Sequence, residues 1–295
     1  MDKQNTTRTI LIGLGVGLVV LTLIAGFWGL FRWASNLWAE DPPPPPASRC
    51  EATMDGSSAS IDLEQSRNAS IMAGIAAQRG LAPRAVSIAI TTAFQESDIR
   101  NLDYGDLDSL GLFQQRPSQG WGTEAQIMDP YYSTGKFYDV MVKVANWENA
   151  DIGDVAQEVQ RSGFPDAYDK HVDRARLLAS ALSGQTPASW SCIVPATDTV
   201  APDLLMSSLI RSYGATALAT LTPATQSDPA FITITTYTEE AAWSTAAFAQ
   251  SWASETGVTA IRVGIYEWKA SPDTLSGWVG DPGSTNAATS VVITF

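Results

Sequence analysis

The stretch that decides the fold runs from residue 95 to residue 115 and reads QESDIRNLDYGDLDSLGLFQQ. It begins where an apolar segment, 83–94, ends, and the hydrophobic residues of that segment recur at helical spacing. After a polar, acidic loop the chain returns through the turn GLFQ at 111–114. We therefore expect a buried helix that carries Glu96 at its end, with a turn that folds back towards this carboxylate.

Glu96 has the expected environment of a general acid. Burial and the negative end of a helix dipole both disfavour the charged carboxylate, so both raise its pKa. A carboxyl group that keeps its proton near neutral pH can protonate a leaving oxygen. Asp106 in the following loop offers the second, ionised carboxylate that glycoside hydrolysis often uses. Taken alone, the same residues also fit an exposed helix-end glutamate and a solvated acidic turn.

The order of these motifs resembles a known superfamily. Glu96-Ser97, then Gly105-Asp106, then Gly-Leu-Phe-Gln at 111–114 is similar to the Glu-Ser, Gly-Asp and Gly-Leu-Met-Gln order of goose-type lysozymes. It also resembles the Glu-Ser and Gly-Leu-Met-Gln pattern of soluble lytic transglycosylases, and both families belong to the lysozyme-like superfamily. The resemblance covers roughly residues 62–184. It implies a mainly α, lysozyme-like (α+β) domain that cleaves the β-1,4 linkage between the amino sugars of peptidoglycan.

The resemblance also implies roles for single residues. Glu96 matches the catalytic acid, Asp106 the aspartate that positions water in goose-type enzymes, and Gln114 the glutamine that lines the sugar groove. Transglycosylases carry an Ala-Tyr-Asn-Ala-Gly motif on a late helix, and here Gln160 stands where its tyrosine would be. This departure favours a hydrolytic or a degenerate site over an anhydro-forming one.

Other residues are candidates for contacts with the glycan. Tyr168 or Tyr131 can supply the missing aromatic side chain from elsewhere in the chain. A tryptophan beside a sugar groove can stack on a pyranose face, as we expect for Trp121, and Arg116 can hold a carboxylate. Trp121 fits equally well as a core residue that closes its loop. The remaining predicted substrate-binding residues are Ser97, Gln115 and Gln160.

Neither metal nor cofactor is expected at this site. His171 is the only histidine of the chain, and it has no histidine or cysteine companions at ligand spacing. We expect it on the surface of the last helix of the domain.

The charge of the chain excludes one class of partner. The 295 residues include 31 acidic and 18 basic ones, which gives a net charge of −13. Binding to nucleic acid requires lysine and arginine to neutralise phosphates, so we do not expect it. The same acidity argues against electrostatic capture of anionic polymers.

A tether to the membrane is expected instead. Residues 10–31 contain no charged residue, and this length can cross a hydrocarbon core of about 30 Å as a helix. We expect a cytoplasmic tail at 1–9, a transmembrane helix at 10–32 and a proline-rich linker at 33–49. The rest would lie outside a bacterial cell membrane that the chain crosses once. A cleaved signal peptide is the alternative.

Two cysteines bracket the first predicted domain. Cys50 and Cys192 are the only cysteines, and in an oxidising exterior this arrangement favours a disulfide. We expect a lysozyme-like domain at 50–192, a linker at 193–201 and a small α/β module at 202–295. No ligand is indicated for that module, and envelope proteins are its expected partners.

The local patterns also predict individual elements. Helices are expected at 62–79, 83–97, 123–128, 130–144, 152–161, 165–183, 202–213 and 239–256, and strands at 231–235, 260–266 and 290–295.

The sequence thus predicts a membrane-anchored enzyme that cleaves peptidoglycan glycan strands. A rival prediction is a non-catalytic protein that binds peptidoglycan or acts as an envelope scaffold through the same groove. An accessory of a secretion or conjugation system that opens the wall locally fits the sequence as well.

Overall fold

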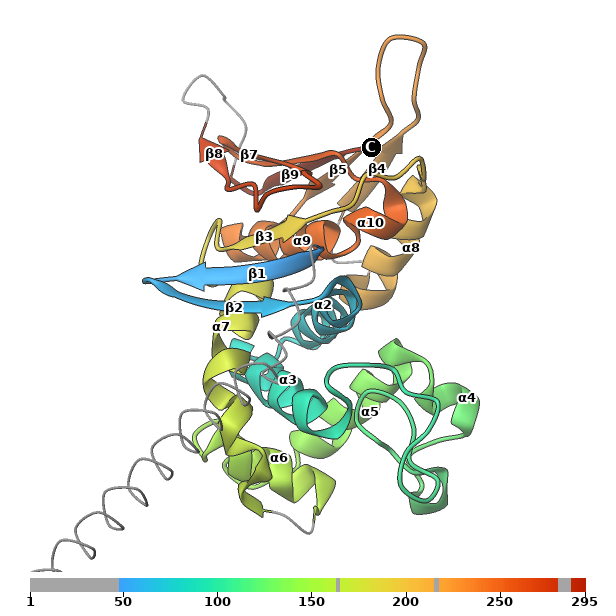
Figure 1. Cartoon of the computed structure of the whole chain (residues 1–295), viewed down its shortest axis with the longest axis vertical. Helices are drawn as coiled ribbons and strands as arrows, with labels where there is room; N and C mark the ends of the chain where they lie inside the picture. Colours follow the sequence, from blue (N-terminus) through green and yellow to red (C-terminus); the bar gives the residue numbers. More distant parts are fainter. Residues whose placement is uncertain (1–47, 163–164, 215–217, 281–287) are drawn as a thin grey trace, which may run out of the picture. The chain divides into compact units, whose positions relative to one another are not determined.

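A computed structural model describes residues 48–162, 165–214, 218–280 and 288–295 (Figure 1). The cytoplasmic tail, the transmembrane helix at 10–32 and nearly all of the proline-rich linker fall outside these residues. Within the described ranges, every helix is too short or too polar to reach across a lipid bilayer.

The helix that carries Glu96 forms for local reasons. Helix α3 (Pro83–Ser97) starts at a proline, which suits the first helical turn because its missing N–H has no partner there. It ends at Asp98, which adopts the left-handed conformation. Helix α2 (Leu63–Gln78) precedes it and starts at Asp62, whose carboxylate accepts the N–H of Gln65 while the Gln65 side chain accepts the N–H of Asp62.

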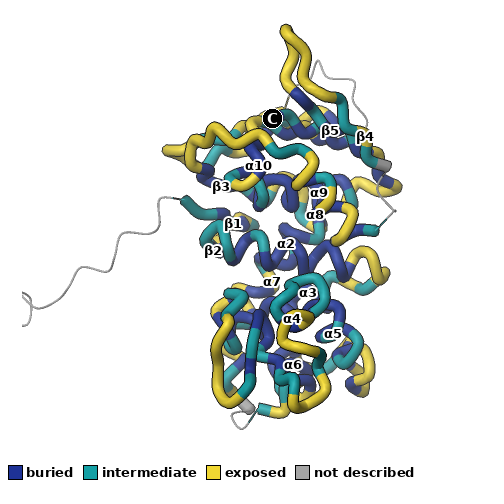
Figure 2. The backbone as a smooth tube through the Cα atoms, turned by 90° about the vertical axis from the view of Figure 1, so that its right-hand side faces the viewer, coloured by how far each residue is buried: buried dark blue, intermediate teal, exposed yellow. Residues whose placement is uncertain are grey.

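The remaining helices surround these two. They are α4 (Glu124–Ile127), α5 (Pro130–Met141), α6 (Ile152–Gln160), α7 (Val172–Leu182), α8 (Pro202–Tyr213), α9 (Glu239–Ser251) and α10 (Ala253–Thr256), with 3-10 turns η1 (Pro117–Gln119), η2 (Pro165–Ala167) and η3 (Asp169–His171). Helix α3 packs against α6 and α7, and α2 packs against α5, α8 and α9. Figure 2 shows α2 and α9 largely in the colour of buried residues.

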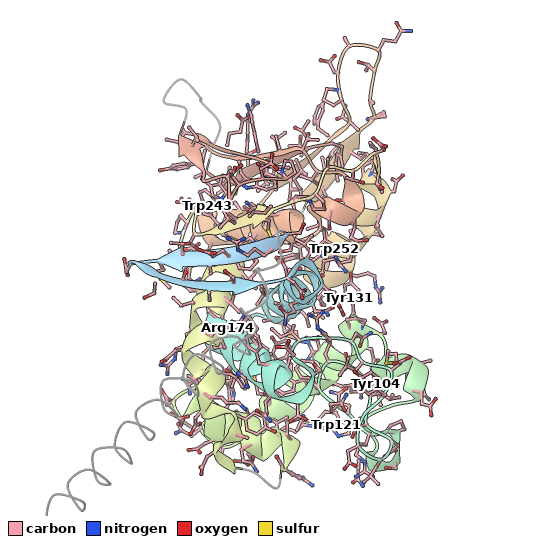
Figure 3. All side chains as sticks on the ribbon, in the orientation of Figure 1. Tyr104, Trp121, Tyr131, Arg174, Trp243 and Trp252 are labelled. Carbon is pink, nitrogen blue, oxygen red and sulfur yellow. A yellow bond between two sulfur atoms is a disulfide. The ribbon has the colours of Figure 1, made fainter. Side chains whose placement is uncertain are left out.

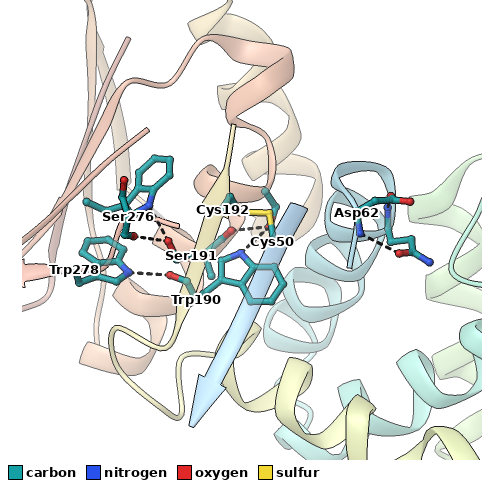
Figure 4. The surroundings of a disulfide bond; sticks show 11 residues. Cys50, Asp62, Trp190, Ser191, Cys192, Ser276 and Trp278 are labelled. Carbon is teal, nitrogen blue, oxygen red and sulfur yellow. Dashed lines mark hydrogen bonds between the residues drawn. A yellow bond between two sulfur atoms is a disulfide. The ribbon is translucent and has the colours of Figure 1, made fainter. Parts of the chain in front are cut away.

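A small antiparallel sheet was not predicted. Its strands are β1 (Arg49–Met54), β2 (Ser57–Ile61) and β3 (Trp190–Ile193), in the order β2-β1-β3. Cys50 lies opposite Cys192 in the pairing of β1 with β3, and the two form the predicted disulfide (Figure 4). The bond closes a segment of 142 residues.

The C-terminal strands form a second antiparallel sheet. Its order is β4-β5-β9-β6-β7-β8, and the strands are β4 (Leu218–Thr222), β5 (Phe231–Thr235), β6 (Ala260–Val263), β7 (Tyr266–Lys269), β8 (Val279–Gly280) and β9 (Ser290–Thr294). Alternate residues such as Ile232 and Ile293 are fully buried, and α9 packs on β6 and β9. One face of the sheet therefore supplies the core.

The predicted fold class is wrong. It placed a mainly α lysozyme-like (α+β) domain after a transmembrane helix and added a separate small α/β module. Instead, the described residues combine helices with two antiparallel sheets and belong to one compact unit, Pro46–Phe295. The helices of the two expected parts pack directly on each other. At one contact between them, a Cβ at Gly74 of α2 would lie only 2.6 Å from the Cβ of Ser212 in α8.

Candidate active site

Glu96 lies half-buried at the end of α3, as the sequence predicts. Burial raises the pKa of its carboxyl group, and hydrogen bonds from the side chains of Tyr168 and Gln160 oppose part of this rise. The Tyr168 hydroxyl donates to Glu96 Oε1 over 2.6 Å. Burial therefore favours the protonated form of the carboxyl group. The side chains of Tyr168 and Gln160 can stabilise the carboxylate by hydrogen bonds when it forms.

Tyr168 supplies an aromatic residue beside the acid. It follows η2 and is fully buried, and burial together with the bond to Glu96 raises the pKa of its hydroxyl. Of the two tyrosines considered from the sequence, this one reaches Glu96. Tyr131 instead lies beneath Arg211, whose guanidinium carbon is 3.7 Å from the centre of its ring.

Gln160 connects the acid to the GLFQ turn. It is the last residue of α6, and its Nε2 donates to the carbonyl oxygen of Phe113 over 2.7 Å. The same side chain hydrogen-bonds to Glu96. One amide thus holds the helix end, the turn and the acid together.

The side chain of Ser97 connects two parts of the backbone near the site. Its hydroxyl is buried and donates to the carbonyl oxygen of Leu112 over 2.7 Å, with Ala93 at 3.2 Å as a second acceptor. It ties the end of α3 to the turn and leaves Glu96, its neighbour in sequence, to face the site. Gln115 is likewise buried and donates to the carbonyl oxygen of Ser133.

The turn places Gln114 by means of two glycines. Gly111 has a φ of +74°, which a residue with a Cβ rarely adopts. The Gln114 amide folds back onto the carbonyl oxygens of Tyr104 and Gly111, each at 3.3 Å. A Cβ at Gly105 would lie 2.6 Å from the carbonyl oxygen of Ser109 and 1.9 Å from Gln114 Oε1, so the absence of a side chain at Gly105 permits this close approach.

The acidic loop does not bring a second carboxylate to Glu96 among the described contacts. Asp106 is exposed, and its carbonyl oxygen accepts the N–H of Ser109. Asp108 instead binds Arg116, whose Nε donates to it over 2.7 Å. That bond, with further bonds from Ser118, holds the pKa of Asp108 well below its usual range.

A groove of about 780 Å³ adjoins these residues. It brings together five of the predicted substrate-binding residues, namely Gln114, Gln115, Arg116, Trp121 and Gln160. Trp121 is half-buried, and Figure 3 shows it in the loop region that contains α4 and η1. Basic residues that the sequence analysis missed line it too, namely Lys136, Lys143 and Arg161.

His171 lies half-buried beside the acid's helix. Its ring stacks on Phe94 with 5.4 Å between centroids, and its Nε2 lies 3.3 Å from Gln95 Oε1. Burial, followed by the charges of Lys170 and Arg174, lowers its pKa. Among the described residues, no group of three or more histidines, cysteines or acids has an arrangement suited to a metal ion.

Two comparisons with known proteins give no match for this chain. No protein-family model matches it, and no curated protein matches it significantly.

Proposed function

We propose that this protein cleaves the glycan strands of peptidoglycan at the β-1,4 linkage between amino sugars, with Glu96 as the general acid. The observation that carries the proposal is the half-buried carboxyl group of Glu96, whose pKa is raised by burial and which accepts a 2.6 Å hydrogen bond from Tyr168. The adjoining groove has a volume of about 780 Å³, which can hold sugar units, and Gln160 belongs both to its lining and to the contacts of Glu96.

The proton transfer follows from these contacts. Glu96 gives its proton to the oxygen that leaves the broken glycosidic bond. Its carboxylate then accepts the hydrogen bonds of Tyr168 and Gln160, and both bonds strengthen as the negative charge develops. Burial keeps the proton in place before the reaction, and the two donors stabilise the carboxylate after it.

The proposed mechanism uses one carboxylate, that of Glu96. Asp106 is exposed, so we do not give it the role of positioning water. Glu96, once ionised, is the base that receives a proton from the attacking group. That group is either water or a hydroxyl of the cleaved sugar itself, and Tyr168 beside the acid supplies an aromatic residue such as the anhydro-forming enzymes use.

The products of digestion test the proposal. The full-length chain is incubated with purified peptidoglycan, and the released fragments are weighed by mass spectrometry beside those from Glu96→Gln. We expect the variant to lose about 10²- to 10⁴-fold of the rate, the usual contribution of a general acid. The exposed Glu148→Gln is the matched control and should cleave like the wild type.

The fragment masses also distinguish the two nucleophiles. Ends formed by attack of a sugar hydroxyl lack one water relative to hydrolysed ends. Equal release of fragments by the wild type and by Glu96→Gln would remove Glu96 from the mechanism.

One observation favours a second candidate, a protein that binds glycan without cleaving it. The described contacts of Glu96 include no second carboxylate, and many glycosidases need one. Binding of glycan strands without any new ends, in the same digestion, would support this candidate and contradict the first.

A further inference from the structure

The groove that Gln114 and Gln160 line carries an excess of positive charge in an otherwise acidic protein. The net charge of the chain is −13. Four basic residues nevertheless line the groove, namely Arg116, Lys136, Lys143 and Arg161, and Asp139 is the one acidic residue among its described lining residues. The positive charge of the groove was not expected from the negative net charge of the chain.

Two of these charges are already neutralised. Arg116 forms its ion pair with Asp108 at 2.7 Å, and Asp139 forms one with Arg79 at 2.9 Å. The other three cations, Lys136, Lys143 and Arg161, make no ion pair within the part of the chain that the structure describes. We refer to these three residues as the basic edge of the groove.

The backbone positions the basic edge. Lys136 lies on α5, and Lys143 lies in the turn that follows the end of this helix at Met141. Arg161 directly follows the last residue of α6 and has a φ of 52°. Gln114, which also lines the groove, has a φ of 46°. Left-handed conformations of residues with a Cβ cost energy and concentrate at functional sites, and here two of them line one groove.

Gln160 connects the basic edge to the acid. Arg161 directly follows Gln160, whose side chain hydrogen-bonds to Glu96 and to the carbonyl oxygen of Phe113. Arg161 therefore lies one residue away from a side chain that hydrogen-bonds to the acid, and both Gln160 and Arg161 line the groove.

We infer that the basic edge is a subsite for anionic substituents of the glycan strand. This inference rests on the proposed function, because it concerns the substrate of that site. The sugars around a glycosidic bond offer mainly neutral hydroxyl and amide groups, which do not require three unpaired cations. The chemistry that fits is an oxyanion, as carried by the carboxylates of stem peptides or by the phosphodiesters of a polymer attached to the strand.

Binding to three glycan preparations tests the inference. The probes are strands with stem peptides, strands that keep an attached phosphodiester polymer, and uncharged β-1,4-linked oligomers of N-acetylglucosamine, because amidase removal of the peptides would leave a free carboxylate on each muramic acid. The full-length Glu96→Gln chain serves as the binder, because it should not consume the probe. We expect one of the charged preparations to bind more tightly than the uncharged strands, and the stronger one identifies carboxylate or phosphate as the ligand.

Removal of two cations should abolish this preference. Lys143→Gln/Arg161→Gln is made in the same background, and both residues are exposed, so the fold should survive. We expect about a tenfold loss of affinity for the charged strands, the sum of two exposed charge contacts, and no loss for the uncharged strands. The difference should shrink at 0.5 M salt, where exposed charges are screened.

The control removes equal charge from elsewhere. Arg176→Gln/Lys269→Gln changes two exposed cations outside the groove and should leave all three affinities unchanged. Equal binding of charged and uncharged strands by the parent chain would overturn the inference while leaving the proposed cleavage intact. Failure to bind or cleave any strand would instead contradict the proposed function itself.

Discussion

The hydroxyl group of Tyr168 lies 2.6 Å from Oε1 of Glu96, although 72 residues separate the two in sequence. The bond joins the end of α3 to the segment between η2 and η3. The packing of α3 against α7, which begins shortly after Tyr168, brings these segments together. The fold therefore fixes the direction in which the acid points, and it does so with a fully buried ring.

Loss of this hydroxyl should change the titration of the acid. The bond from Tyr168 lowers the pKa of Glu96 against the effect of burial, so Tyr168→Phe should raise that pKa further. The acid then keeps its proton to higher pH, and the alkaline fall of the pH–rate profile should move upwards. The maximal rate should drop by about 10- to 100-fold, because the carboxylate formed after proton transfer loses a charge-assisted donor.

Two measurements check this expectation. Carboxyl ¹³C NMR of labelled Glu96 gives the pKa directly, and fragment release as a function of pH gives the profile. Tyr132→Phe is the control, because its hydroxyl bonds to the carbonyl oxygen of Trp121 at 3.3 Å and not to the acid. An unmoved Glu96 titration in Tyr168→Phe would show that the bond does not act on the acid.

The acid should also reduce stability at neutral pH. The pKa of Glu96 is raised above its ordinary value of 4.5 in the folded chain, and in the unfolded chain it is ordinary. Between these two values the folded state binds more protons, so the free energy of unfolding falls as pH rises through the folded pKa. Glu96→Gln removes this loss and should be more stable at pH 7 by roughly 1 kcal/mol.

Thermal unfolding at several pH values provides the measurement. The stability advantage of Glu96→Gln should be present at pH 7 and should shrink below pH 4.5, where the wild-type carboxyl group is protonated in both states. An advantage of the same size at pH 4 and pH 7 would point to a cause other than ionisation.

The helices were predictable because local features start and end them. Asp62 and Pro83 each mark the first turn of a helix that the structure contains. The strands β1 and β2 were not, because their residues are small and polar and the pairing partner of β1, β3, lies far away in sequence. The separation into two modules failed because α2 buries small residues such as Gly74 against α8, and these leave no strong apolar stripe in the sequence.

The site was predictable only in part. The positions of Glu96 and Gln114 follow from one continuous stretch, since a helix end and a turn are local. The contact of Tyr168 with the acid depends on packing between distant helices. The basic edge escaped notice because Arg161 is separated in sequence from Lys136 and Lys143, and only the groove brings them together.

The hydroxyl group of Ser97 should matter for stability and for the geometry of the turn. Its bond of 2.7 Å to the carbonyl oxygen of Leu112 is buried, so Ser97→Ala leaves a buried acceptor without its partner. We expect a loss of about 1–3 kcal/mol in the free energy of unfolding. Chemical denaturation measures it, and Ser207→Ala, at an exposed serine of α8, should change it little.

Ser97→Ala also separates a structural role from a binding role. If the serine holds the turn, the rate of cleavage should fall while the affinity for glycan changes little, because Glu96 and the turn lose their alignment. A wild-type stability together with weaker glycan binding would place the hydroxyl group in contact with substrate instead.

The disulfide should contribute strongly to stability. Cys50–Cys192 closes a segment of 142 residues, and a cross-link of that length stabilises by about 4–5 kcal/mol in the chain-entropy model. Cys50→Ser/Cys192→Ser should lose stability of this order, and reduction of the wild type should reproduce the loss. Denaturation curves with and without reductant measure both, and a reductant effect on the double variant would reveal a cause other than the disulfide.

Trp121 should bind sugar through the face of its ring. It is half-buried and lines the groove, and its carbonyl oxygen already accepts the hydroxyl of Tyr132, so the backbone of the loop is held independently of the indole. Trp121→Ala should weaken the binding of uncharged glycan strands by about tenfold, because stacking of an aromatic ring contributes about 1 kcal/mol beyond its buried area.

Trp121→Phe keeps an aromatic face and should restore most of the affinity. Binding isotherms with the uncharged N-acetylglucosamine oligomers measure this, since the basic edge should contribute nothing to their binding. Equal losses in both variants, together with a lowered melting temperature, would instead identify Trp121 as a core residue that closes its loop.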